Sequence, residues 1–173
     1  MARSPLRLSS ERLTTDRLAL EPLRVADADQ LAPVLDDPAL HTFTGGTPDT
    51  VDQLRERYRR QVAGRSPDGS ACWLNWVVRL RDSGAAVGTV QATVTTQEDR
   101  TVAELAWVVA APHQRRGYAR EAAGEMVRRL RDEGVEVVVA HVHPEHAASI
   151  AVARALGLRA TDRRVAGEVR WEG

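Results

Sequence analysis

Residues 104–134 predict a buried strand, a glycine turn and an amphipathic helix in direct succession. The strand, Glu104–Val109, is rich in β-branched and aromatic residues, and Pro112 lies just beyond its end. In the segment that follows, apolar residues recur at the spacing of one face of an α-helix, at Ala119, Ala122, Ala123, Met126, Val127 and Leu130. Gly134 stands where a C-terminal cap is expected. These residues indicate a fold that joins strands and helices around one core.

The turn between this strand and helix has the chemistry of a phosphate site. The hexapeptide Gln114–Ala119 contains two arginines directly before Gly117. The start of a helix presents unpaired backbone N–H groups, which together with positive charge suit an anion. We therefore predict that a pyrophosphate binds here. An ordinary strand–helix connection is the alternative interpretation.

Length and composition restrict the class of protein. The chain has 173 residues, enough for one domain, which we expect over residues 12–173 after a flexible, polar N-terminal arm at residues 1–11. The 24 basic residues, all of them Arg, balance 24 acidic ones, which argues against a nucleic-acid partner. Cys72 is the only cysteine, and no apolar run reaches the length of a membrane span. We expect a cytoplasmic protein without a membrane partner.

The remaining segments predict an α+β domain with a mixed, mostly antiparallel sheet of six to seven strands and about four helices. Helical spacing or turn residues support each helix, and β-branched or alternating runs support each strand. The predicted helices are residues 27–35, 50–63, 119–131 and 144–156, and the predicted strands are residues 17–23, 73–80, 86–94, 101–109, 135–142 and 165–171.

The motifs together resemble the GNAT acetyltransferase superfamily. The hexapeptide Gln114–Ala119 is similar to the family's Q/R-x-x-G-x-G/A signature, and residues 155–158 (Ala-Leu-Gly-Leu) resemble the end of its fourth helix. Residues 13–23 resemble the start of the branch that contains the ribosomal-protein N-terminal acetyltransferases. The resemblance covers residues 12–171. It implies a sheet whose fourth and fifth strands splay apart, with acetyl-CoA in the gap.

The resemblance also implies which residues bind the cofactor. A bulge in the fourth strand would turn a backbone N–H toward the thioester carbonyl near Trp107, Val108 or Val109. The pyrophosphate and pantetheine would be held by the turn and by the fourth helix, that is, by Gln114, Arg115, Arg116, Gly117, Tyr118, Ala119, Arg120, His146 and Ser149.

Three residues are candidates for catalysis. Glu104 is a charged residue within an apolar strand, where partial burial would suit a general base. An exposed carboxylate or a partner for an arginine is the alternative. The family's usual helix-four Tyr is replaced by Ala153, so Ser149 or His146 is left to protonate the departing thiolate, unless water does so. Ser149 and His146 could equally serve as cofactor contacts only.

Other interpretations concern metals, nucleophiles and the acceptor. His141, His143 and His146 invite a zinc site, but strand-end polar residues are the simpler interpretation, and we expect no metal. Cys72 fits a core position better than a nucleophile. The acceptor would be a small-molecule or peptide amine, with the Thr42–Pro48 loop as the specificity element. A non-catalytic acyl-CoA-binding module is the rival function, and a homodimer is possible.

Overall fold

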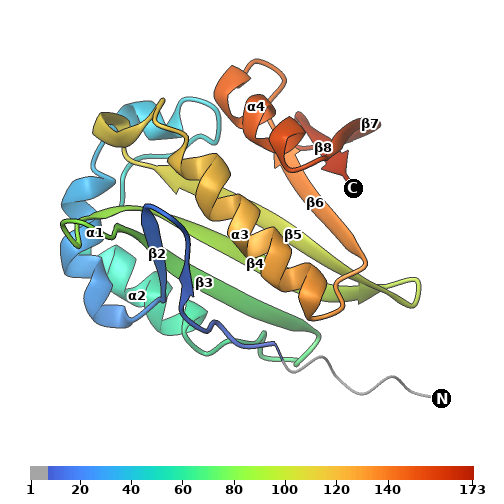
Figure 1. Cartoon of the computed structure of the whole chain (residues 1–173), viewed down its shortest axis with the longest axis horizontal. Helices are drawn as coiled ribbons and strands as arrows, with labels where there is room; N and C mark the ends of the chain where they lie inside the picture. Colours follow the sequence, from blue (N-terminus) through green and yellow to red (C-terminus); the bar gives the residue numbers. More distant parts are fainter. Residues whose placement is uncertain (1–7) are drawn as a thin grey trace.

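The computed structural model describes residues 8–173, which form one eight-stranded sheet with helices on both faces (Figure 1). The strands lie in the order β1-β2-β3-β4-β5-β6-β8-β7. Their bounds are β1 Leu13–Thr14, β2 Leu18–Pro22, β3 Ala71–Leu80, β4 Ala86–Gln97, β5 Arg100–Val109, β6 Val137–Val142, β7 Arg159–Val165 and β8 Glu168–Glu172. The helices are α1 Ala28–Val34, α2 Val51–Gln61, α3 Tyr118–Asp132 and α4 Ala147–Ala155, with short 3-10 helices η1 Val25–Asp27, η2 Pro38–His41 and η3 Ala111–His113.

The sheet opens between β5 and β6, its one parallel pair among the described strands. These strands pair only from Val102↔Val137 to Leu105↔Ala140. Beyond that point β6 turns toward α4 and leaves β5, as Figure 1 shows. The other pairs, including β6 with β8, are antiparallel. The expected splay between the fourth and fifth long strands is therefore present.

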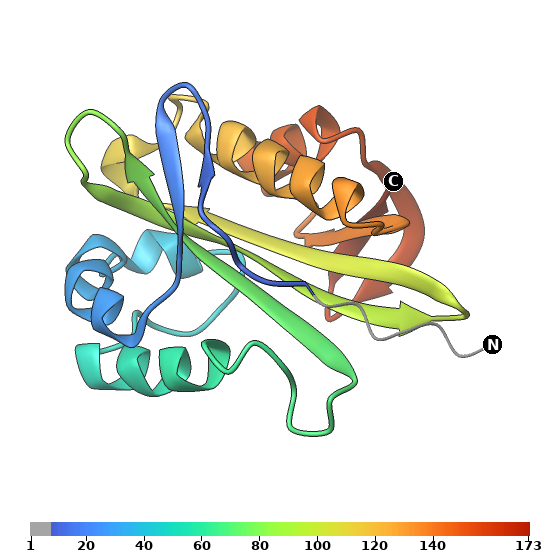
Figure 2. The same cartoon turned by 60° about the horizontal axis from the view of Figure 1, so that its bottom comes forward.

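The helices divide between the two faces of the sheet (Figure 2). Helix α3 packs its face containing Ala122, Met126 and Leu130 into the main core, together with Trp76 of β3 and Trp171 of β8. Helices α1 and α2 cover part of the opposite face, where a smaller cluster is formed by Leu23, Ala28, Leu31, Ala32, Leu54, Tyr58 and Val77. Helix α3 thus buries most of the apolar stripe that its sequence spacing predicts.

Local signals set the ends of the helices. Thr50 and Gln53 form a capping box at the start of α2, each side chain accepting a hydrogen bond from the other's backbone N–H. Gly134 ends α3 with a φ of 92°, and the N–H of Val135 bonds the carbonyl of Leu130. A glycine adopts this left-handed conformation at low cost, which confirms the expected cap.

The structure corrects several expectations. It has eight strands instead of six to seven, because β1 has only two residues and β7 is almost entirely exposed and polar, so neither shows hydrophobic alternation. Of the arm expected at residues 1–11, residues 1–7 lie outside the described part of the chain. From Leu8 onward the chain contacts the domain: the Glu11 carbonyl accepts the Trp76 indole N–H at 2.8 Å, and Leu8 packs on the core.

The bulge expected in β5 near Trp107–Val109 is wrong. β4 and β5 pair in unbroken register up to Gly88↔Val109. The irregularity lies in β4, where the pairing with β3 skips Val87. At the next residue a Cβ added to Gly88 would lie 2.0 Å from the Val108 carbonyl oxygen, so only glycine permits this close approach of the two backbones.

Candidate active site

A cleft of about 860 Å³ follows the gap between β5 and β6. Its walls come from the end of β5, the turn before α3, the end of β6, α4 and the segment between α1 and α2. All the predicted cofactor-binding residues except Arg116 line it: Trp107, Val108, Val109, Gln114, Arg115, Gly117, Tyr118, Ala119, Arg120, His146 and Ser149. The fold therefore brings two distant parts of the chain, residues 107–120 and 146–149, to one cleft.

The turn before α3 presents an anion-binding helix start. Arg115 and Gly117 have φ values of 61° and 80°, both in the left-handed region. Gly117 is the N-cap residue and makes no side-chain cap, so the first N–H groups of this 15-residue helix are not capped by a side chain there. The dipole of α3 adds partial positive charge at the same place. The predicted phosphate chemistry thus has a structural basis in this turn.

Arg17, in the segment before β2, holds the same turn in place from a position outside the cleft. Its guanidinium donates a hydrogen bond to the Arg116 carbonyl at 2.9 Å and pairs with Glu121 of α3 at 2.6 Å. It also lies over the Tyr118 ring, 4.7 Å from the centroid. Burial alone would raise the pKa of Glu121, but hydrogen bonds from Thr15 and Arg17 outweigh it and the pKa falls. Glu121 therefore stays ionised and holds Arg17 in place.

The edge of β5 that faces the gap offers backbone groups to a ligand. The Val108 carbonyl faces Gly88 of β4, and the Val109 carbonyl accepts the Gln114 side-chain N–H at 2.9 Å. Successive residues of a strand direct their N–H and C=O groups to opposite edges. Because Val108 faces β4, the N–H groups of Trp107 and Val109 face the gap.

The start of α4 forms the opposite wall. His146 is the N-cap residue, and its Nδ1 accepts the Ser149 N–H at 3.4 Å. Burial first, and the charge of His143 second, lower the pKa of His146, so the ring is held neutral as this acceptor role requires. Phe43 from the loop after η2 stacks on the ring with centroids 4.4 Å apart.

Glu104 lies at the edge of the cleft instead of in its lining. Its side chain is 58% exposed, so the partial burial expected from its apolar strand is wrong. The neighbouring Leu105 and Ala106 do line the cleft, as does His141, whose Nδ1 lies 3.0 Å from Glu104 Oε1. Strand alternation places Glu104 on the face of the sheet opposite to Ala103 and Leu105, which belong to the main core.

A smaller cavity of about 220 Å³ lies beneath α2 and adjoins the cleft at the end of β5. Trp107 and Val108 line both spaces. Arg57 of α2 also lines both and is paired with Asp49. The other polar residues around this cavity are Tyr58, Gln61, Asn75, Thr89 and Gln91.

Sequence reasoning missed several of these residues. Phe43 lies in the loop expected to set specificity, but nothing in the sequence indicated that it stacks on His146. Arg17 belongs to the family-like segment at residues 13–23, but the sequence indicated no role for it. Cys72 is half-buried on β3 and does not line the cleft. Among the described residues, no three side chains form a metal-binding group.

The comparisons with known proteins agree with this arrangement. Residues 17–159 match the family model for the acetyltransferase (GNAT) domain, so the chain belongs to the GNAT acetyltransferase family. Such enzymes use acetyl-CoA, and this protein is therefore an acetyl-CoA-dependent acetyltransferase. No curated protein is similar enough to be matched. No described helix is both long and apolar enough to cross a bilayer.

Solved structures share the fold across nearly the whole chain. A GNAT-family acetyltransferase from Bordetella pertussis is 27% identical, with a TM-score of 0.68 over 94% of this chain and 97% of that one. The ribosomal-protein acetyltransferase RimL, solved with coenzyme A, is 13% identical with a TM-score of 0.76 over 94% and 97%. The microcin C7 self-immunity acetyltransferase, solved with acetyl-CoA and AMP, is 12% identical with a TM-score of 0.73 over 92% and 93%.

The cleft residues suit acetyl-CoA. A Cβ at Gly117 would find only the Arg17 guanidinium within 4 Å, at 3.3 Å, so the space in front of the helix start is open. Arg115 and Arg120 line the same end and supply charge for a pyrophosphate. Small side chains of α4 leave room along the rest of the cleft, at Ala148, Ser149, Ala151 and Ala155.

Proposed function

We propose that this acetyltransferase moves the acetyl group of acetyl-CoA directly to a primary amine while both substrates are bound. The observation that carries the proposal is the arrangement of the cleft around the β5–β6 gap. One end holds the uncapped start of α3, and the other meets the exposed carboxylate of Glu104 and the cavity beneath α2. The two substrates would thus meet at Trp107 and Val108, which line both spaces.

Each proposed catalytic residue has one task. Acetyl-CoA supplies an acetyl group activated as a thioester. The N–H of Trp107 or Val109 would bind its carbonyl oxygen, because both face the gap. Glu104 would accept the amine proton, directly or through water. Ser149, or else His146, would donate a proton toward the sulfur.

The charge of the cleft favours an acceptor with a single amine. Among the described residues, the carboxylates that line the cleft are Asp49 and Glu168, and Asp49 is already paired with Arg57. A polycationic aminoglycoside would need more unpaired negative charge than this. The amide and hydroxyl groups around the smaller cavity suit a polar, largely neutral acceptor. A protein N-terminus, as in the ribosomal-protein enzymes, or a small metabolite amine meets these conditions.

An acylation screen with a base variant tests the proposal. Thiol release from acetyl-CoA is measured with a panel of N-terminal peptides, monoamines and aminoglycosides. We expect amine-dependent release by the wild type and a loss of roughly 10²–10⁴-fold in kcat/KM for Glu104→Gln. Coenzyme A binding without any amine-dependent release would support a non-catalytic acyl-CoA module instead. A loss below threefold for Glu104→Gln would assign the proton to water or to another carboxylate.

A further inference from the structure

His141 and Glu104 form an isolated pair across the start of the β5–β6 gap. Glu104 pairs with Val139 of β6, and His141 follows two residues later on the same face of the sheet. Nδ1 of His141 lies 3.0 Å from Oε1 of Glu104. The two side chains differ in exposure, because 14% of the His141 side chain is accessible against 58% of the Glu104 side chain. A largely buried ring therefore holds one oxygen of an exposed carboxylate.

The chemistry of the two groups fixes the direction of this bond. An ionised carboxylate can only accept, so Nδ1 of His141 carries the hydrogen and donates it to Oε1. The other ring nitrogen, Nε2, is shielded from solvent and has no hydrogen-bond partner among the described residues. In this conformation Nε2 is not accessible to water or to a substrate amine. The ring can therefore influence proton transfer only through Glu104.

An exposed glutamate needs such an anchor to act as a base. A free side chain of this type samples several rotamers, and an interaction that holds it in one geometry removes the alternatives. The bond to His141 ties Oε1 to a residue that lines the cleft, whereas Glu104 itself does not line it. Oε2 has no bond to His141 and stays open to an incoming proton.

We propose that His141 is the positioning residue for Glu104, holding Oε1 by its Nδ1–H so that Oε2 takes the proton of the acceptor amine. The inference rests on the proposed acetyl transfer to an amine. The acceptor arrives as an ammonium, one proton passes to Oε2, and the electron pair left on the nitrogen attacks the thioester carbonyl carbon. The C–S bond then breaks, and the departing thiolate takes up the equivalent of the second proton that the nitrogen loses. Because the Glu104 side chain is exposed, it then returns the proton to solvent.

The histidine directly after β6, His143, does not share this role. Nδ1 of His143 accepts the N–H of Glu145 at 3.2 Å, and its ring packs against Phe43 with centroids 5.2 Å apart. It is thus occupied by its own turn and by the loop after η2. Of these two histidines, only His141 contacts Glu104 through a hydrogen bond in the described structure.

Two near-isosteric substitutions test the role of the N–H donor. Asn places a side-chain N–H close to the position of Nδ1, and Leu has a similar shape without a donor. We expect His141→Leu to lower kcat about 10–100-fold with less than a twofold change in the KM for acetyl-CoA. His141→Asn is expected to recover kcat to within about fivefold of the wild type. Thermal melts and coenzyme A affinity confirm that both variants are folded.

A double-mutant cycle with Glu104→Gln separates positioning from a structural role. If His141 acts through Glu104, adding His141→Leu to Glu104→Gln lowers kcat by less than twofold. If the kcat of the double variant fell by the product of the two single losses, the proposal would be overturned. Equal kcat values for the His141→Leu and His141→Asn variants would also overturn it. Equal and severe losses in those two variants would make the imidazole itself the base. A wild type that releases no thiol with any amine would refute the proposed function instead.

Discussion

At the scale of single residues, Arg17 connects the first strands to the cofactor turn. Its side chain donates to the Arg116 carbonyl and pairs with Glu121, which also accepts the Arg17 backbone N–H at 3.1 Å. The turn contains two residues with positive φ, one of them an arginine, and such a backbone persists only where its surroundings hold it. Arg17 supplies that support without lining the cleft.

Removing the Arg17 guanidinium should therefore weaken cofactor binding indirectly. We expect Arg17→Met to reduce coenzyme A affinity roughly tenfold, about 1.4 kcal/mol, measured by titration calorimetry. Arg81→Met is the control, because Arg81 bonds the carbonyls of Thr15 and Asp16 in the same region but not the turn. Equal affinities for the two variants would show that the turn holds its conformation unaided.

His146 gives a pH-dependent prediction at the same scale. Its pKa is lowered in the folded protein, so the unfolded chain binds the proton more readily. Its contribution to stability is complete above the unfolded pKa of about 6.5 and is lost as the pH falls toward the lowered value. His146→Asn keeps a capping acceptor but removes this titration.

The stability of His146→Asn relative to the wild type should thus rise as the pH falls. Urea midpoints measured at pH 7.5 and pH 5.5 report the difference. Histidines that do not interact with His146 cancel because both proteins contain them, and the coupling of His146 to His143 is part of the effect measured. A difference that stays constant between the two pH values would contradict the assigned cause of the shift.

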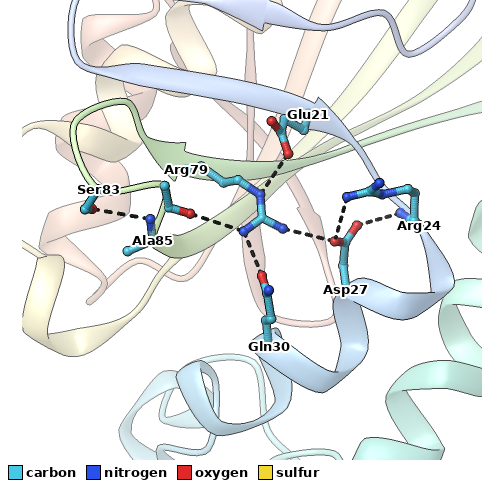
Figure 3. Close-up of polar contacts among 8 residues, drawn as sticks. Glu21, Arg24, Asp27, Gln30, Arg79, Ser83 and Ala85 are labelled. Carbon is cyan, nitrogen blue, oxygen red and sulfur yellow. Dashed lines mark hydrogen bonds and ion pairs between the residues drawn. The ribbon is translucent and has the colours of Figure 1, made fainter.

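At the scale of elements, a polar cluster fixes α1 against the sheet (Figure 3). Arg79 of β3 donates to Glu21 of β2 at 2.9 Å, to Asp27 at the start of α1 at 3.0 Å and to Gln30 of α1 at 2.7 Å. The Arg79 and Asp27 side chains are only 12% and 5% exposed. Leu35 directly follows α1 and lines both cavities, so this cluster sets one wall of the acceptor region.

Breaking the cluster should destabilise the protein strongly. Arg79→Met leaves Asp27 as a buried carboxylate without its main partner, which costs about 3–5 kcal/mol in the free energy of unfolding. Arg59→Met on α2 removes an exposed i,i+3 pair with Glu56 and should cost less than about 1 kcal/mol. Urea denaturation of both variants measures the contrast. If both variants lost a similarly small free energy of unfolding, the apolar contacts of the new methionine would be enough to replace the Arg79 interactions.

The elements also show what the sequence can and cannot predict. Apolar periodicity predicted α3, and Gly134 predicted its end, because both signals depend on neighbours along the chain. The contact of Arg79 with Asp27 spans 52 positions, and no local pattern reports it. The same holds for the exposure of Glu104. The close contact of Gly88 with the Val108 carbonyl likewise follows from strand pairing and not from a local sequence pattern.

At the scale of the whole molecule, the cofactor cleft joins segments that are otherwise separate. Beyond Leu105 and Ala140, β5 and β6 no longer pair, and the cleft lies between α4 and the start of α3. A ligand that contacts both walls binds the folded chain and not the unfolded one. Binding must then raise the free energy of unfolding in proportion to the logarithm of ligand concentration.

Coenzyme A should therefore stabilise the entire domain against heat. At 100 times its Kd the ligand adds about 2.7 kcal/mol, which raises the Tm of a chain of this length by roughly 5–11 °C. Gly117→Glu should abolish the increase, because its side chain enters the pyrophosphate space with a negative charge. Gly124→Glu is the matched control in α3: its Cβ position has no atom within 4 Å and it does not line the cleft. If calorimetry showed the same ligand-induced increase for both variants, the pyrophosphate would bind elsewhere than at the start of α3.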